Sequence, residues 1–178
     1  MRIFPTVLLF LFSALSAADD FIDFEISANQ MSSYYRAYIF FDGDKKYSKP
    51  LLAITSKASV YDGILKDKPQ LLIQWHKLIE LVHTVLADET NIRNVNTQAH
   101  WEVMSGAMNR TLEEEVKDDL YNKQFEDPKS NNYLRLLLLR MEKTLAVYMA
   151  LTNPVGGLGI SAESPDLDSK ILEISNML

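Results

Sequence analysis

Apolar residues recur at intervals of three and four positions along most of this chain, which is the spacing that lines one face of an α-helix. No segment alternates apolar and polar residues as a half-buried strand does, and no hairpin turn flanked by such segments is present. The spacing predicts helices over Phe21–Phe40, Pro50–Leu65, Pro69–Ala87, Thr97 onward, Lys129–Leu151 and Pro165–Met177. We therefore expect an all-α protein, a single irregular up-and-down helical bundle of five or six helices.

Prolines indicate where four of these helices begin, because a proline in the first helical turn removes no hydrogen bond. Each proline also follows a polar residue that can cap a helix N-terminus. The pairs are Ser48 with Pro50, Asp67 with Pro69, Asp127 with Pro128, and Ser164 with Pro165. The polar segment 88–96 lies between two predicted helices, and we expect it to be a loop.

The predicted helix Lys129–Leu151 contains Leu134 and four consecutive leucines, Leu136–Leu139. These residues make the helix apolar on nearly every side, which is typical of a helix surrounded by others. We therefore expect it to be the central and most buried helix of the bundle.

The helix that begins near Thr97 contains a conflict. Glu115 and Asp119 fall on the continuation of the apolar stripe that Trp101 begins, and burial of an unpaired charge is costly. We expect that the helix either breaks between Gly106 and Arg110 or projects its second half away from the core.

The first 18 residues have the order of a secretory signal peptide. Arg2 is followed by an uncharged stretch rich in leucine and phenylalanine, and then by the small residues Ser16–Ala18. As a helix, about sixteen residues measure roughly 24 Å, which falls short of a hydrocarbon core of ~30 Å. We expect cleavage after Ala18, so that 1–18 is a signal peptide and 19–178 a helical domain with no stable membrane insertion.

The net charge and the missing cysteines limit the binding partners and the cellular location that we expect. A formal net charge of −6 repels nucleic-acid phosphates and anionic membranes, and no run of lysine and arginine offsets it. We therefore expect no nucleic-acid partner. With no cysteine, an exported domain must be held together by packing alone. This combination favours the bacterial periplasm, with the extracellular medium as the second choice.

Three residues of the third predicted helix resemble part of a metal site. His76, Glu80 and His83 share one face, and the last two form the Glu-x-x-His pattern of carboxylate-bridged metal bundles. Such a site needs a second Glu-x-x-His, which the chain lacks. We expect these three side chains to be surface residues without a metal.

A second line of side chains combines imidazole with thioethers. His100, Met104 and Met108 follow one another at intervals of four, and these ligands suit Cu(I). However, the two methionines flank Trp101 on the apolar stripe, where methionine ordinarily fills gaps in a core. We expect packing here and no cofactor anywhere in the chain.

Two further groups of residues suggest binding. Aromatic residues are dense in the first predicted helix, and Tyr34, Tyr38 and Phe41 are candidates for an apolar-ligand groove, with Tyr34 and Phe41 the most exposed. The alternative is that they form one wall of the core.

The acidic group consists of Glu113, Glu114, Glu115, Asp118 and Asp119. It is either a solvated face or a docking surface for a basic protein.

Catalytic motifs are missing from the sequence. It contains no Gly-x-Ser-x-Gly, no His-Glu-x-x-His and no cysteine nucleophile, so an enzyme is unsupported. The sequence favours an exported non-enzymatic protein that acts through protein–protein contact, as an inhibitor, an immunity-type protein or an envelope assembly factor. The alternative is a helical carrier of an apolar small ligand or a metal.

Overall fold

The computed structural model describes residues 4–115, 131–152, 171–172 and 174–175, with side chains at 20–115, 133–150 and the four C-terminal positions. Its elements are α1 (Phe4–Phe40), α2 (Lys45–Thr55), α3 (Ala58–Ile64), α4 (Pro69–Ala87), the 3₁₀-helix η1 (Glu89–Arg93), α5 (Val95–Glu115) and α7 (Asn131–Thr152). These ranges contain no strand, which confirms the all-α prediction.

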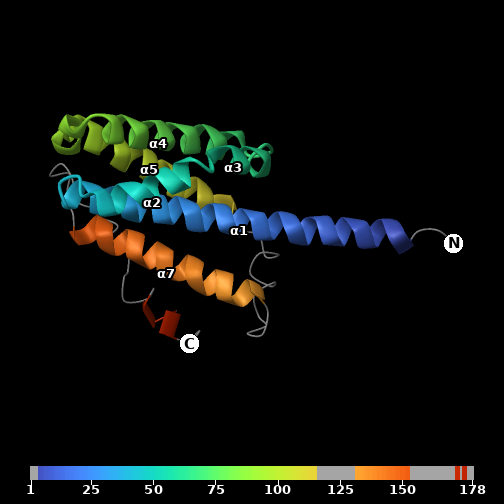
Figure 1. The fold of residues 1–178 in the computed structure, drawn as a ribbon. Coiled ribbons are helices and arrows are strands. Elements are labelled where there is room, and N and C mark those ends of the chain that lie inside the picture. Colours follow the sequence, from blue (N-terminus) through green and yellow to red (C-terminus); the bar gives the residue numbers. More distant parts are fainter. Residues whose placement is uncertain (1–3, 116–130, 153–170, 173, 176–178) are drawn as a thin grey trace.

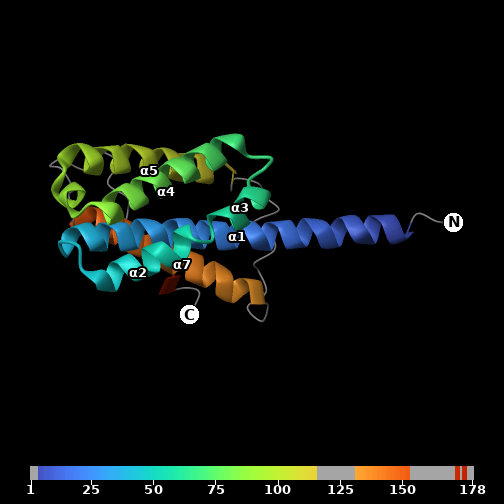
Figure 2. The ribbon, with the colours of Figure 1, turned by 45° about the horizontal axis from the view of Figure 1, so that its top comes forward.

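The helices alternate in direction around α1 (Figures 1 and 2). α2 and α3 return along α1, α4 and α5 form an antiparallel pair on one side of it, and α7 lies on the other side. α7 runs in the same direction as α1, because Arg135 contacts Asp23 and Glu142 contacts Gln30. The predicted up-and-down bundle is therefore confirmed, with α1 at its centre.

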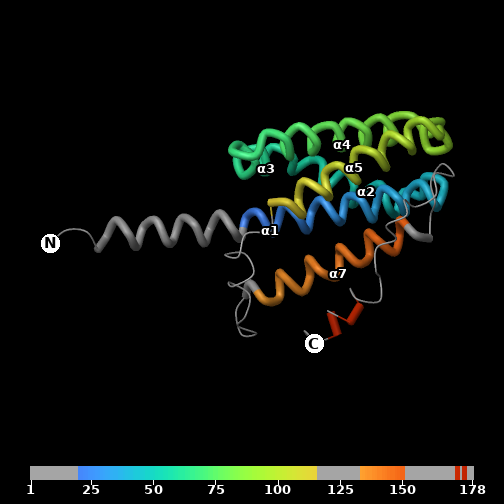
Figure 3. Tube along the Cα trace, turned by 180° about the vertical axis from the view of Figure 1, so that it is seen from behind, coloured from blue at the N-terminus to red at the C-terminus, as the bar shows by residue number. Residues whose placement is uncertain are grey.

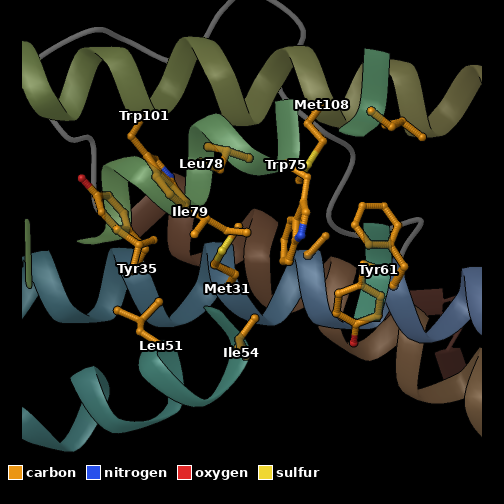
Figure 4. Packing of buried hydrophobic residues seen from close by; sticks show 14 of the residues in the cluster. Met31, Tyr35, Leu51, Ile54, Tyr61, Trp75, Leu78, Ile79, Trp101 and Met108 are labelled. Atoms are coloured by element: carbon orange, nitrogen blue, oxygen red, sulfur yellow. The ribbon is translucent and has the colours of Figure 1, made fainter. Parts of the chain in front are cut away.

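The apolar stripe of α1 forms one wall of the main core. Trp75 of α4 and Trp101 of α5 are fully buried opposite it (Figure 4). The ring centroid of Phe24 lies 5.3 Å from that of Trp75 in an edge-to-face arrangement, and Tyr35 stacks on Trp101 at 3.7 Å. Edge-to-face and stacked aromatic pairs add to the stabilisation that burial provides, so two aromatic contacts hold the α4–α5 pair onto α1.

The prediction that Lys129–Leu151 is the central and most buried helix is wrong. In α7 the buried side chains among those described are Leu136, Leu139 and Ala146, whereas Leu134 and Leu138 are exposed. The physical reason is that, among the described helices, α1 is the main neighbour of α7. A helix with one neighbour leaves most of its surface uncovered, whatever its composition.

Of the two alternatives for the helix that begins near Thr97, the break between Gly106 and Arg110 is wrong, because α5 continues without interruption to Glu115. The residues after Glu115, on which the second alternative also depends, lie outside the described range. Thr111 and Leu112 are buried in its last turns. Glu115 stays exposed, and its carboxylate accepts a hydrogen bond from the Lys68 ammonium. For Glu115, an ion pair at the surface thus removes the conflict between its charge and its place on the apolar stripe.

The predicted helix starts are partly correct. Pro69 begins α4 and Ala87 ends it, as expected, although the cap position is Lys68 rather than Asp67. Pro50 lies inside α2 instead of beginning it, because the carboxylate of Asp44 accepts the Lys46 N–H at 2.8 Å and fixes an earlier start.

The segment predicted as one helix over 50–65 is two helices, α2 and α3. The segment 88–96, predicted as a loop, contains η1, whose first turn is capped by Asp88 through the Thr90 N–H at 3.0 Å. The starts predicted at Pro128 and Pro165 lie outside the described residues. Of the helix predicted over 165–177, residues 171–172 and 174–175 are described and are helical.

Candidate interaction surface

Three charged side chains of α7 contact α1: Arg135, Glu142 and Lys143. The guanidinium of Arg135 donates from Nε to Oδ1 of Asp23 at 3.1 Å. Further along, Nζ of Lys143 lies 3.1 Å from Oε1 of Glu25, whose side chain is fully buried. Because a buried carboxylate needs a partner to offset its desolvation, the Lys143 contact ties α7 to one side of α1.

A hydrogen bond and an apolar cluster complete the α1–α7 contact. Nε2 of Gln30 donates to Oε1 of Glu142 at 3.0 Å. A separate apolar cluster joins the two helices, formed by Ile22, Ile26, Leu136 and Leu139. Ion pairs and one short apolar cluster therefore fix the rotation of α7 about its axis.

The opposite side of α7 carries a row of large apolar side chains that are 41–64% exposed. We call this row the α7 stripe, and it consists of Leu134, Leu138, Met141, Leu145 and Tyr148. Figures 1 and 3 show α7 on the side of α1 that faces away from the α4–α5 pair, with the short helical fragments at 171–172 and 174–175 beyond it. The stripe is thus displayed on the surface of the molecule.

The spacing of the α7 stripe is informative. Its intervals are 4, 3, 4 and 3 positions, the heptad repeat with which one helix packs along another. Isolated exposed apolar residues need no explanation, whereas a contiguous apolar patch on a soluble surface indicates an interaction site. The α7 stripe therefore has both the composition and the spacing of a surface that accepts a helix.

Sequence reasoning missed this surface because it assumed that a leucine-rich helix faces inward. The heptad intervals were present in the sequence, but so was a second apolar set at Leu136 and Leu139. Which set is buried depends on the acidic residues of α1, Asp23 and Glu25, which lie more than a hundred positions away. A comparison of the charges on the two helices could have indicated the orientation.

The acidic residues predicted to bind a partner are partly described. Glu113, Glu114 and Glu115 are exposed at the end of α5, and Glu115 pairs with Lys68. Asp118 and Asp119 lie outside the described residues.

The candidate metal ligands of α4 lie on its exposed face. Glu80 and His83 are exposed, and Nε2 of His76 lies 2.9 Å from Oδ1 of Asp62 in α3. Of the second line, His100 is exposed, Met104 is half-buried and Met108 is buried in the core. Within the described ranges, no group of three or more histidines and carboxylates is close enough to hold a metal ion.

The three aromatic candidates have different environments. Tyr38 is buried, and burial, together with the charge of Glu89, raises the pKa of its phenol. Tyr34 is half-buried against the core rather than strongly exposed as expected. Phe41 is exposed at the end of α1. The three side chains therefore do not line one groove: one belongs to the core, one to its edge and one to the surface.

The fold and the α7 stripe define an all-α bundle that exposes an apolar helix face. In the part of the chain with described side chains, no helix is both long enough and apolar enough to cross a membrane. Comparisons with protein-family models, with curated proteins and with solved structures find no match for this chain.

Proposed function

We propose that this chain is an exported, non-enzymatic protein that acts by binding another protein, and that the α7 stripe is the binding surface. The observation that carries the proposal is the row of five exposed apolar side chains at heptad intervals, on a helix that pairs Arg135 and Lys143 with α1. The apolar leader over residues 3–18 supports export. An inhibitor, an immunity-type protein and an envelope assembly factor would all use such a surface.

The occupant that fits the stripe is an amphipathic helix with basic flanks. A helix is favoured because heptad intervals place side chains into the gaps of a second helix. Basic flanks are favoured because the chain as a whole has a net charge of −6, which attracts a cationic partner. The same charge repels a second copy of this chain.

The carrier hypothesis has less support. It would require the aromatic residues of α1 to surround a ligand, but Phe24 and Tyr35 pack directly against the two tryptophans of the core. Their rings therefore serve the packing of the bundle.

The proposal can be tested with synthetic peptides of three heptads that carry leucine at both core positions. One peptide has lysine at the flanking positions, and the other has glutamate there. We expect the basic peptide to bind with a Kd in the micromolar range and the acidic peptide at least about tenfold more weakly. The Leu138→Glu/Met141→Glu variant should lose binding of the basic peptide, as measured by fluorescence polarisation.

A matched control places glutamate at two exposed apolar positions elsewhere, in the variant Val60→Glu/Val103→Glu, which should bind as wild type does. Equal binding of both peptides would contradict the basic occupant. Unchanged binding in Leu138→Glu/Met141→Glu would contradict the stripe as the site. A stable homodimer that this variant abolishes would replace the partner helix with a second copy.

A further inference from the structure

Met141 is the middle residue of the α7 stripe. Leu134 and Leu138 precede it and Leu145 and Tyr148 follow it, at intervals of four and three positions. Its side chain is 50% exposed. When two helices pack through heptad positions, each core side chain inserts between residues of the facing helix. The thioether of Met141 therefore lies where the proposed contact would exclude water most completely.

The other methionines with described side chains are better protected from solvent. Met31 is fully buried and Met108 is 2% exposed, both in the main core. Met104 and Met149 are half-buried. Because an oxidant dissolved in water must reach the sulfur atom, exposure decides which thioether reacts first. Among the methionines whose side chains the structure describes, Met141 is therefore the one that an oxidant reaches most easily.

The thioethers have no thiol to compete with them for an oxidant, because the sequence has no cysteine. Hydrogen peroxide oxidises a thioether to a sulfoxide. A lone pair of the sulfur attacks one peroxide oxygen, the O–O bond breaks, and the leaving hydroxide takes up the proton of the transferred oxygen to become water. The sulfur loses two electrons and the peroxide gains them. The reaction therefore needs only the side chain and the peroxide.

We propose that Met141 is an oxidation site at which peroxide switches off binding by the α7 stripe. This inference rests on the proposed function of the stripe. Oxidation converts a flexible apolar side chain into a polar one, and a partner helix with leucine at its core positions offers the sulfoxide oxygen no hydrogen-bond donor. Burial of a polar group without a partner is unfavourable, so the oxidised stripe binds more weakly. Methionine sulfoxide reductases reverse the change.

The switch acts on binding and not on folding. Leu136 and Leu139 pack on α1, and Arg135 and Lys143 pair with its carboxylates. Met141 belongs to neither core cluster of the described residues, and half of its side chain lies in water. A polar group at such a surface position has little effect on stability. The oxidised protein should therefore melt within about 2 °C of the untreated protein.

The test treats the full chain with dilute hydrogen peroxide and follows each methionine by peptide mass spectrometry. We expect the sulfoxide to form at Met141 at least about tenfold faster than at Met31 or Met108, which react only after local opening. Binding of the basic three-heptad peptide, measured by fluorescence polarisation, should weaken at least about tenfold as Met141 is oxidised. It should recover after treatment with methionine sulfoxide reductases.

Three variants assign the effect to one sulfur atom. Met141→Leu keeps the stripe apolar without the sulfur, so it should bind the peptide as wild type does and keep binding after peroxide treatment. Met141→Gln places a polar side chain at the same position and should bind as weakly as the oxidised protein. Met149→Leu, at a half-buried position of the same helix, is the matched control and should remain as sensitive to peroxide as wild type.

The outcomes separate the switch from the binding surface on which it rests. Unchanged peptide binding after complete oxidation of Met141 would overturn the switch alone. A loss of binding in peroxide-treated Met141→Leu that equals the loss in wild type would also overturn it, as would faster oxidation at Met31 or Met108. Failure of the untreated protein to bind the basic peptide would contradict the proposed function, and the switch with it.

Discussion

Tyr35 combines a favourable ring contact with an unfavourable hydroxyl. Its ring stacks on Trp101, but within the described residues its hydroxyl oxygen is buried without a hydrogen-bond partner. Burial of a polar group without a partner costs free energy. Burial, and secondarily the charge of Glu102, also raises the pKa of the phenol well above its usual value.

We predict that Tyr35→Phe keeps or raises the free energy of unfolding at pH 7, by up to about 1 kcal/mol. The folded-state pKa of Tyr35 is raised, so the phenol of the unfolded chain loses its proton at a lower pH than the phenol of the folded protein. The free energy of unfolding of wild type therefore falls as pH rises above about 10, the pKa of a tyrosine in an unfolded chain. The variant should therefore lose less stability than wild type between pH 8 and pH 10.5 in urea titrations. A loss of 2 kcal/mol or more (on the scale of about 1–3 for a broken buried hydrogen bond) at pH 7 would show that the hydroxyl is bonded.

Gly43 is a position where backbone and packing both require glycine. Its φ of 87° is strained for residues with a side chain, and an added Cβ would lie 2.7 Å from Cδ1 of Ile92. We predict that Gly43→Ala lowers the free energy of unfolding by about 1–3 kcal/mol. Gly63, where an added Cβ meets no atom within 4 Å, provides the control, and an equal effect of Gly63→Ala in thermal melts would contradict this account of the turn.

At the level of helices, α7 shows what local sequence determines and what it does not. The heptad and leucine patterns predict a helix, and the structure has one over Asn131–Thr152. They do not determine which side is buried, because two apolar sets compete and distant acidic residues on α1 decide between them. α4 was predicted to its ends, since Pro69 and a single apolar stripe agree. The start of α2 was missed because a cap at Asp44 outweighed Pro50.

Two adjacent leucines of α7 provide a direct test of its orientation. Leu139 is 1% exposed and Leu138 is 41% exposed. We predict that Leu139→Asp lowers the free energy of unfolding by about 3 kcal/mol or more, because the carboxylate would be buried without a partner. Leu138→Asp should cost less than about 1 kcal/mol. Urea unfolding of both variants distinguishes them, and a larger loss in Leu138→Asp would mean that the helix is rotated.

For the whole molecule, the all-α bundle was predictable because apolar residues recur at helical intervals along most of the chain. The candidate binding surface was harder to predict, because the exposure of the α7 stripe depends on how α7 packs against α1.

We predict that the exported protein begins near Asp19 and melts cooperatively. Sequencing of its N-terminus after expression in a secreting bacterial host identifies the first residue. Thermal melting followed by circular dichroism tests whether unfolding is cooperative. Recovery of the chain with Met1 intact from the membrane fraction would contradict the assignment of a cleaved signal peptide.

The central claim is that α7 displays its apolar stripe on the surface for a partner helix, and the absence of cysteine allows a direct test. Single cysteines at Leu138, Met141, Leu139 and Val103 can be labelled with a thiol reagent under native conditions. We predict that Leu138→Cys and Met141→Cys react as fast as Val103→Cys, and that Leu139→Cys is at least about a hundredfold slower because labelling requires local opening. Adding the basic peptide should slow the two stripe cysteines and leave Val103→Cys unchanged. Slow labelling of the stripe cysteines without peptide, or no protection with it, would contradict the account.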